Sequence, residues 1–179
     1  MKCKSTGVQG RGVLVDLEKH YKHERKIVGY NELLEALDDQ TATVRPGDLL
    51  CLYTGFADLI LSMNKQPDGE VLANSCAVLD GRDERLLQWI TDSGIVAICA
   101  DNFAVEACPA REGSGDSFPG LPLHNHCLFK LGIHLGELWY FAELAAWLRT
   151  NNRSSFFLTA PPLRLPGAVG SPATPVATV

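Results

Sequence analysis

Short apolar runs alternate along the chain with segments whose apolar residues recur at helical spacing. The runs typical of buried strands are at residues 12–16, 49–54, 95–100 and 155–159. Helical spacing predicts helices over residues 30–38, 58–64, 83–93, 124–130 and 138–150. Strands that alternate with helices indicate an α/β fold, which we expect to form a single domain over residues 1–179. A stretch at about 108–121, rich in Pro, Gly, Ser and charge, is predicted to be a flexible loop within it.

The predicted sheet is small, and its first strand begins close to the start of the sequence. Four strands leave sheet edges whose backbone N–H and C=O groups need a partner. We therefore expect association of this chain with further copies of itself, as a homo-oligomer, or a missing segment that covers the edge.

Composition narrows the class of protein. The 179 residues are 46% hydrophobic and 21% charged, which is typical of a globular chain rather than a disordered one or a coiled coil. A net charge of −5 argues against a nucleic-acid partner, and the longest apolar runs are too short to cross a membrane. No apolar segment follows the basic N-terminus, and the six cysteines form no C-x-x-C pair, so we expect a cytoplasmic protein with reduced thiols.

Residues 122–137 hold three of the five histidines together with one carboxylate. Imidazole and carboxylate are usual ligands of zinc and manganese, so His124 and Glu137, 13 residues apart, are candidate metal ligands. The alternative is that His126 packs within a helix, His134 lies on a strand face and Glu137 is an acid in the first turn of the next helix.

Polar residues also follow the predicted strand at 95–100 directly. The carboxyl ends of strands in open α/β sheets are where sites collect, and here Asp101 or Asn102 could orient a substrate or a ligand histidine. Glu106 is a candidate for an acid behind a metal ligand, and His126 is kept with these three as a further candidate near substrate or metal. The alternative is that Asp101 and Asn102 only satisfy a turn.

Several stretches, in order, resemble the cyclase family, the metal-dependent amide and lactam hydrolases that include bacterial kynurenine formamidase and isatin hydrolase. They are residues 10–16 (GRGVLVD), 45–56 (RPGDLLCLYTGF), 100–106 (ADNFAVE), 123–124 (LH), 131–139 (LGIHLGELW) and 160–172 (APPLRLPGAVGSP). Their order and spacing are similar to the C-terminal portion of the family.

The resemblance implies a swivelling β/β/α fold, a divalent zinc or manganese ion and a small-molecule amide substrate. The reaction it implies is that of an arylformamidase: hydrolysis of an N-formyl arylamine, as in tryptophan catabolism, or of a cyclic amide. In that chemistry the metal polarises the carbonyl and lowers the pKa of a bound water, and a histidine acts as general base. His124 and Glu137 occupy the places of the family's late metal ligands, and the resemblance assigns no catalytic residue in this chain.

One departure from the family changes the expected function. The early H-x-G-T-H-x-D motif, which supplies most ligands and the catalytic base, is absent, and no histidine precedes His20. We therefore expect a family member truncated at its N-terminus, in which two ligands do not define a catalytic site. The hypotheses are a metal-dependent hydrolase whose metal and activity are lost, a non-catalytic remnant that acts through protein association, and a site completed by an oligomer neighbour.

Overall fold

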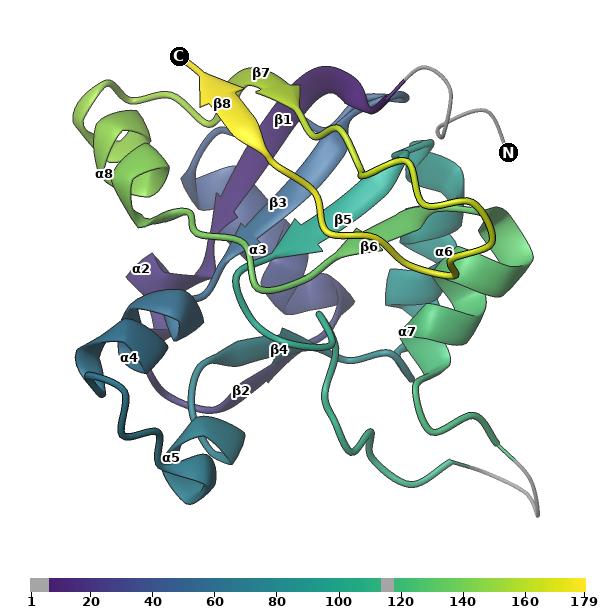
Figure 1. Ribbon diagram of the computed structural model, residues 1–179, viewed down its shortest axis with the longest axis horizontal. Coiled ribbons are helices and arrows are strands. Elements are labelled where there is room, and N and C mark those ends of the chain that lie inside the picture. Colours follow the sequence, from purple (N-terminus) through teal and green to yellow (C-terminus); the bar gives the residue numbers. More distant parts are fainter. Residues whose placement is uncertain (1–6, 114–117) are drawn as a thin grey trace.

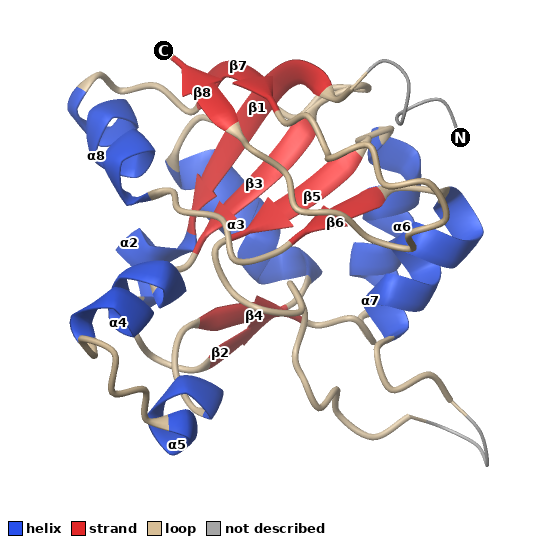
Figure 2. Cartoon of the chain, viewed as in Figure 1, coloured by secondary structure: helices blue, strands red, loops and turns tan. Residues whose placement is uncertain are grey.

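A six-stranded mixed sheet forms the centre of the protein (Figures 1 and 2). The computed structural model describes residues 7–113 and 118–179. The strand order is β6-β5-β3-β1-β7-β8. The first four strands pair in parallel, β7 pairs antiparallel with β1, and β8 pairs antiparallel with β7. The strands are β1 (Gln9–Asp16), β3 (Leu49–Tyr53), β5 (Ala97–Ala100), β6 (His134–Gly136), β7 (Ser155–Thr159) and β8 (Val176–Thr178). A second, two-stranded parallel sheet pairs β2 (Lys26–Val28) with β4 (Ala77–Leu79).

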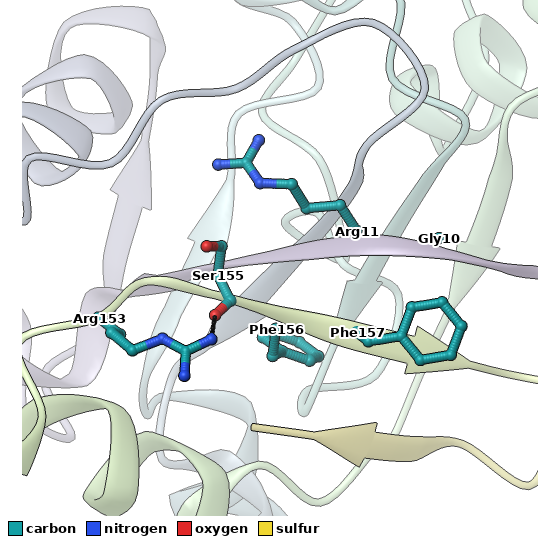
Figure 3. Close-up of a pocket in the computed structure, with 6 residues that line it drawn as sticks. All are labelled: Gly10, Arg11, Arg153, Ser155, Phe156 and Phe157. Atoms are coloured by element: carbon teal, nitrogen blue, oxygen red, sulfur yellow. Dashed lines mark hydrogen bonds between the residues drawn. The ribbon is translucent and has the colours of Figure 1, made fainter.

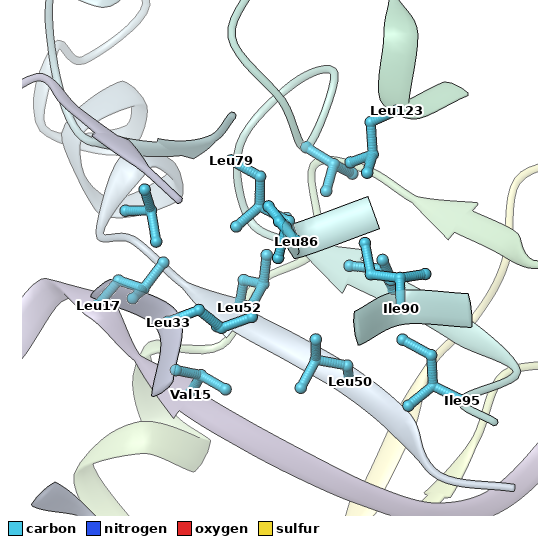
Figure 4. Close-up of a cluster of buried hydrophobic side chains, with 14 of the residues drawn as sticks. Val15, Leu17, Leu33, Leu50, Leu52, Leu79, Leu86, Ile90, Ile95 and Leu123 are labelled. Atoms are coloured by element: carbon cyan, nitrogen blue, oxygen red, sulfur yellow. The ribbon is translucent and has the colours of Figure 1, made fainter. Parts of the chain in front are cut away.

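The central strands are apolar on both sides because helices cover both faces of the sheet. On one face, Val15, Leu50 and Ile98 from three adjacent strands contribute to the larger hydrophobic core. The helices α3 (Tyr30–Asp39) and α6 (Glu84–Ser93) pack there through Leu33 and Ile90, among others, as Figure 4 shows for part of this cluster.

The opposite face is covered by α8 (Ala142–Thr150). Ala145 and Leu148 of this helix pack with Cys51 and Cys99, which lie side by side in the register of β3 and β5. Phe156 of β7 closes the same core next to Gly12, where a Cβ atom would lie 2.5 Å from the phenyl ring. A side chain larger than hydrogen therefore does not fit at this point of β1.

The remaining helices are short and lie around the sheet. They are α2 (Leu17–Tyr21), α4 (Phe56–Ser62), α5 (Gly69–Ala73), α7 (Pro122–His124) and the π-helix η1 (Asn125–Leu131), which continues directly from α7. The boundaries of α6 follow from local chemistry: the Asp83 side chain accepts hydrogen bonds from the backbone of Arg85 and Leu86, and Gly94 ends the helix at a φ of 69°.

The fold confirms the α/β prediction and its main elements, with three corrections. The predicted four strands miss β2, β4, β6 and β8, each only three residues long and too short to give a periodic signal. The helix predicted over residues 138–150 begins at Ala142, because Leu138 has a φ of 56°, outside the helical range. The N–H groups of Leu138 and Trp139 donate to the carbonyls of Asn102 and Ala100. The short helices α2 and α5, of five residues each, are also not among the predicted elements.

The predicted loop at 108–121 has no helix or strand over residues 108–113 and 118–121, while residues 114–117 lie outside the described residues. The first strand lies inside the sheet, between β3 and β7, so the sheet edges are β6 and β8 instead. All three residues of β8 are exposed. Within the described ranges, no helix combines the length and the apolar character that crossing a membrane requires.

Candidate metal-ligand site

The candidate site lies at one edge of the main sheet, beyond the carboxyl end of β6. Glu137 follows this strand directly, and His124 is the last residue of α7. Pro122 begins α7, where a residue without an N–H suits the first helical position. The next two N–H groups, of Leu123 and His124, donate 2.9 Å hydrogen bonds to the Glu106 carboxylate. The Glu106 side chain thus acts as the N-cap of α7, although it is remote from this helix in the sequence.

His124 lies between two carboxylates. Its Nδ1 is 2.9 Å from Oε1 of Glu106, and its Nε2 is 3.1 Å from Oε1 of Glu137. The Glu106 side chain is fully buried, whereas the side chains of His124 and Glu137 are 22% and 37% exposed. The imidazole therefore connects a buried acid to an acid that solvent or a ligand can reach.

The charges around the imidazole raise the pKa of His124 above its usual 6.5. The hydrogen bond to Glu106 is the main cause and the one to Glu137 adds to it, while burial acts in the opposite direction. A neutral ring that donates from Nδ1 to Glu106 presents an unprotonated Nε2 to Glu137. Two lone pairs 3.1 Å apart repel each other, so this gap favours a positive charge, either a proton or a metal cation.

Asp101 is fully buried and holds the turn after β3. Its two carboxylate oxygens accept hydrogen bonds from the N–H and hydroxyl of Thr54 and from the N–H of Gly55, at 2.7–2.9 Å. Burial raises the pKa of Asp101 and these hydrogen bonds lower it, with burial the larger effect. The observed role of Asp101 is therefore to accept the hydrogen bonds of the turn at Thr54 and Gly55.

Asn102 is also buried, and its amide N–H₂ donates to the carbonyl of Ala77 at 2.9 Å. Its backbone carbonyl accepts from Leu138, the residue after Glu137, so Asn102 supports the segment that carries this candidate ligand. Its side-chain oxygen Oδ1 is buried with no hydrogen-bond partner within the described protein.

The other histidines of the segment point to different surroundings. His126 lies on η1, where Nε2 is 2.9 Å from the hydroxyl of Thr91 on α6, and burial lowers its pKa. His134 opens β6 opposite Ala97. Glu137 lies before α8 and outside its first turn, which excludes the alternative that this acid only caps that helix. His124 is therefore grouped with Glu106 and Glu137, whereas His126 contacts Thr91 on α6.

These residues alone do not fit a catalytic metal ion. A catalytic zinc site has about three protein ligands in addition to water. Over residues 7–113 and 118–179, no three His, Cys, Asp or Glu side chains are grouped so as to hold a metal ion. The pair of His124 and Glu137 offers two donors, so a complete centre needs at least one further ligand.

The sequence does not single out Gly81, which lies against the carboxylate of Glu106. A Cβ atom at this position would collide with Oε2 of Glu106 and would lie 2.8 Å from the backbone N of Leu123. Only a residue without a side chain lets the carboxylate reach the start of α7. The single available signal is that a glycine directly follows Asp80, which indicates a turn but no site.

A shallow hollow of about 320 Å³ lies far from this site in the sheet order (Figure 3). Its lining comes from the start of β1, from β7 and from the segment before β7, whereas Glu137 follows β6 at the other edge. The lining residues are Gly10, Arg11, Arg153, Ser155, Phe156 and Phe157. Arg11 is already engaged by Asp48 at 2.7 Å and Arg153 by the carbonyl of Ser155, so this hollow has no link to the candidate site.

Comparison with known proteins identifies the family. Residues 3–107 match the family model named Cyclase, which is more than half of the chain. The chain belongs to the cyclase family. The matched range includes Glu106, and His124 and Glu137 lie after it. A search among curated proteins finds no match.

Solved structures share the fold of this cyclase-family chain. A crystal structure of a novel cyclase is 32% identical, with a TM-score of 0.79 over 95% of this chain and 53% of that chain. A potential metal-dependent hydrolase with cyclase activity is 18% identical, with a TM-score of 0.56 over 94% and 64%. Isatin hydrolase A from Labrenzia aggregata, bound to benzyl benzoate, is 12% identical, with a TM-score of 0.66 over 95% and 61%. The last two likenesses, at such low identity, concern the fold alone.

The chain spans about half the length of the novel cyclase and less than two thirds of the two hydrolases. The resemblance to the cyclase family and the α/β fold expected from the sequence are thus confirmed.

Proposed function

We propose that this chain carries part of the active site of a metal-dependent amide hydrolase, with His124 and Glu137 as two ligands of a divalent zinc or manganese ion. The observation that supports this most is the row Glu106–His124–Glu137, in which an imidazole is held from one side by a buried carboxylate and faces a second carboxylate with its other nitrogen. Metal-binding histidines are commonly oriented by such an acid. Family membership favours amide hydrolysis as the chemistry.

The substrate class that we propose is a small amide, an N-formyl arylamine or a cyclic amide. Two of the similar structures are described as a hydrolase with cyclase activity and as isatin hydrolase, which is compatible with this class. Because two donors do not make a catalytic centre, hydrolysis requires a further ligand beyond those that the described residues group together. An oligomer neighbour is one source of it.

Metal content tests this proposal directly. We would measure zinc and manganese per chain by inductively coupled plasma mass spectrometry on protein purified without chelator. About one ion per chain, lost in both His124→Ala and Glu137→Ala, supports the ligand assignment. The matched control is His126→Ala, which removes an imidazole two residues away that contacts Thr91, and it should keep the metal.

Hydrolysis of an N-formyl arylamine is then assayed with the metal-loaded protein. Turnover that disappears in His124→Ala and persists in His126→Ala supports a hydrolase. Metal below stoichiometry, unchanged in His124→Ala and Glu137→Ala, contradicts the proposal.

A non-catalytic role through association is the second candidate. It is favoured by the incomplete donor set and by β8, an edge strand whose three residues are all exposed. Sedimentation velocity at several concentrations measures the assembly, and Val176→Lys places a charge on this edge. A homo-oligomer that dissociates in this variant, in a protein without bound metal, would favour the second candidate over the first.

A further inference from the structure

Glu106 reaches the candidate site by a short extension of the small sheet. The N–H of Leu79, the last residue of β4, donates to the carbonyl of Val105, and the N–H of Ala107 donates back to the carbonyl of Leu79. This pairing places Glu106 in a parallel bridge with Leu79. The backbone on both sides of Glu106 is thereby hydrogen-bonded to Leu79.

The carboxylate of Glu106 accepts three hydrogen bonds and has almost no contact with solvent. Oε2 accepts from the N–H of Leu123, and Oε1 accepts from the N–H of His124 as well as facing Nδ1 of its ring, all at 2.9 Å. The residue is 1% exposed. A buried carboxylate is costly unless it is hydrogen-bonded, so these donors both satisfy it and fix its orientation.

The close approach of Gly81 adds a second constraint. There is no room for a Cβ between this glycine and Glu106, so the carboxylate is confined between the backbone at residue 81 and the first turn of α7. The carboxylate is thus held in one place. From there its Oε1 faces Nδ1 of the His124 ring.

We propose that Glu106 is a positioning residue that keeps the ring proton of His124 on Nδ1 and so presents an unprotonated Nε2 toward Glu137. Both oxygens of Glu106 already accept backbone N–H groups, so this carboxylate is oriented as an acceptor toward the ring. A neutral imidazole has one ring proton, and the contact of Nδ1 with the buried Glu106 is shorter than that of Nε2 with the part-exposed Glu137, 2.9 against 3.1 Å, so Nδ1 is the donor. The use of the arrangement for metal binding rests on the proposed function, whereas the tautomer itself does not. Fixing the tautomer in advance makes Nε2 available as a ligand without a proton shift within the ring.

Glutamine at this position removes the arrangement with little change in size. One end of its amide is an N–H₂ group, which faces either the N–H of Leu123 or the N–H and ring nitrogen of His124. In the first case two donors oppose each other. In the second the amide donates to Nδ1 and moves the ring proton to Nε2. In the first case the amide oxygen still accepts from Nδ1–H, so we expect Glu106→Gln to replace the single Nδ1–H form by a mixture of the two tautomers.

The test is long-range ¹H–¹⁵N NMR of the imidazole rings in metal-free protein, at a pH high enough for neutral histidine. We expect the Nδ1–H form for His124 in the wild type and a mixture or the Nε2–H form in Glu106→Gln. The ring of His126 serves as an internal control, because its contact is with Thr91 and its spectrum should not change. An Nε2–H form in the wild type, or an unchanged Nδ1–H form in folded Glu106→Gln, would overturn the proposal.

A second readout separates this inference from the proposed function. Titration with Zn²⁺ alone, followed by calorimetry, should show an affinity about 10- to 100-fold lower in Glu106→Gln than in the wild type. Glu106→Asp, which keeps the carboxylate, should recover part of that loss. The Nδ1–H form without zinc binding in the wild type would contradict the proposed function and support the role of Glu106. If Glu106→Gln does not fold, the wild-type spectrum alone decides.

Discussion

Arg149, in the last turn of α8, binds Asp16 at the carboxyl end of β1 through two nitrogens of its guanidinium group. Nε donates to Oδ2 at 2.5 Å and Nη2 donates to Oδ1 at 2.7 Å, across 133 residues of sequence. Asp16 also accepts from the N–H of Lys19 and so caps α2. One buried carboxylate thereby connects the helix on one face of the sheet to the chain that leaves β1.

Removal of this guanidinium leaves the Asp16 carboxylate, which is 4% exposed, without its strongest partner. We expect Arg149→Ala to lower the free energy of unfolding by about 2–3 kcal/mol, because hydrogen bonds to charged groups contribute about 1.5–3 kcal/mol. Urea denaturation followed by circular dichroism measures the change. Arg45→Ala, at an exposed position, is the control and should lie within about 0.5 kcal/mol of the wild type. An equal effect of the two substitutions would show that the ion pair contributes nothing.

Asp83 connects two helices that cover the same face of the sheet. Oδ1 caps α6 through the N–H groups of Arg85 and Leu86, and Oδ2 accepts a 2.7 Å hydrogen bond from the N–H of Tyr30 at the start of α3. Asp83→Asn turns one acceptor into a donor and opposes one of these N–H groups. We expect a loss of about 1–2 kcal/mol in the free energy of unfolding near neutral pH.

The effect of Asp83→Asn should depend on pH. Burial acts to raise the pKa of Asp83, but the backbone hydrogen bonds outweigh it, and the pKa lies below the ordinary value of 3.8. A depressed pKa means that the carboxylate stabilises the fold above the unfolded value and that this contribution is lost as the pH falls through the folded value. Urea denaturation at a series of pH values should therefore show a difference between the two proteins that is full above about pH 5 and shrinks in acid. A difference that grows in acid would contradict the assigned hydrogen bonds.

Leu50 lies at the centre of the larger core, on the middle strand β3 between β1 and β5, and is fully buried. Leu50→Ala leaves a cavity in a sheet covered on both faces, and we expect it to cost about 2–5 kcal/mol. Leu61→Ala makes the same chemical change on α4, where the side chain is 65% exposed, and should cost less than about 1 kcal/mol. Thermal and urea unfolding of both variants would reveal whether the core is centred on β3.

The sequence predicts the elements whose pattern is long and buried, and it misses those whose stability comes from partners elsewhere. β1 and α6 have clear apolar periodicity and appear where they are expected. β8 has three exposed residues and forms only because β7 pairs with it, a contact that no local pattern encodes. Leu138 and Trp139 read as the start of a helix, but their N–H groups donate to carbonyls at the end of β5 and beyond it.

The candidate site shows the same limit. His124 and Glu137 can be named from their residue types, and Glu106 from its position after a strand. Their grouping depends on the bridge between Leu79 and Glu106 and on the absence of a side chain at Gly81. Both are tertiary features. The alternative for Asp101, that it satisfies a turn, corresponds to its observed hydrogen bonds, and its assignment near a substrate stays a prediction.

The described cysteines should differ sharply in reactivity, although all five are free thiols. Cys108 is exposed, whereas Cys51, Cys76, Cys99 and Cys127 are buried. Burial also raises the pKa of Cys76 and Cys127 to about 12. Since the thiolate is the reactive form, such a pKa leaves roughly one thiol in ten thousand ionised at about pH 8. We expect iodoacetamide to label Cys108 in the native protein while the four buried thiols stay unmodified.

Peptide mass spectrometry at several labelling times measures each cysteine separately, so Cys3, outside the described residues, does not disturb the readout. In urea every thiol should react, which is the control for reagent access. Labelling of Cys51 and Cys99 should appear only with global unfolding, because both lie within the sheet under α8. Labelling of Cys76 or Cys127 in native buffer at the rate of Cys108 would show that the packing of β4 or of η1 against the core opens far below global unfolding.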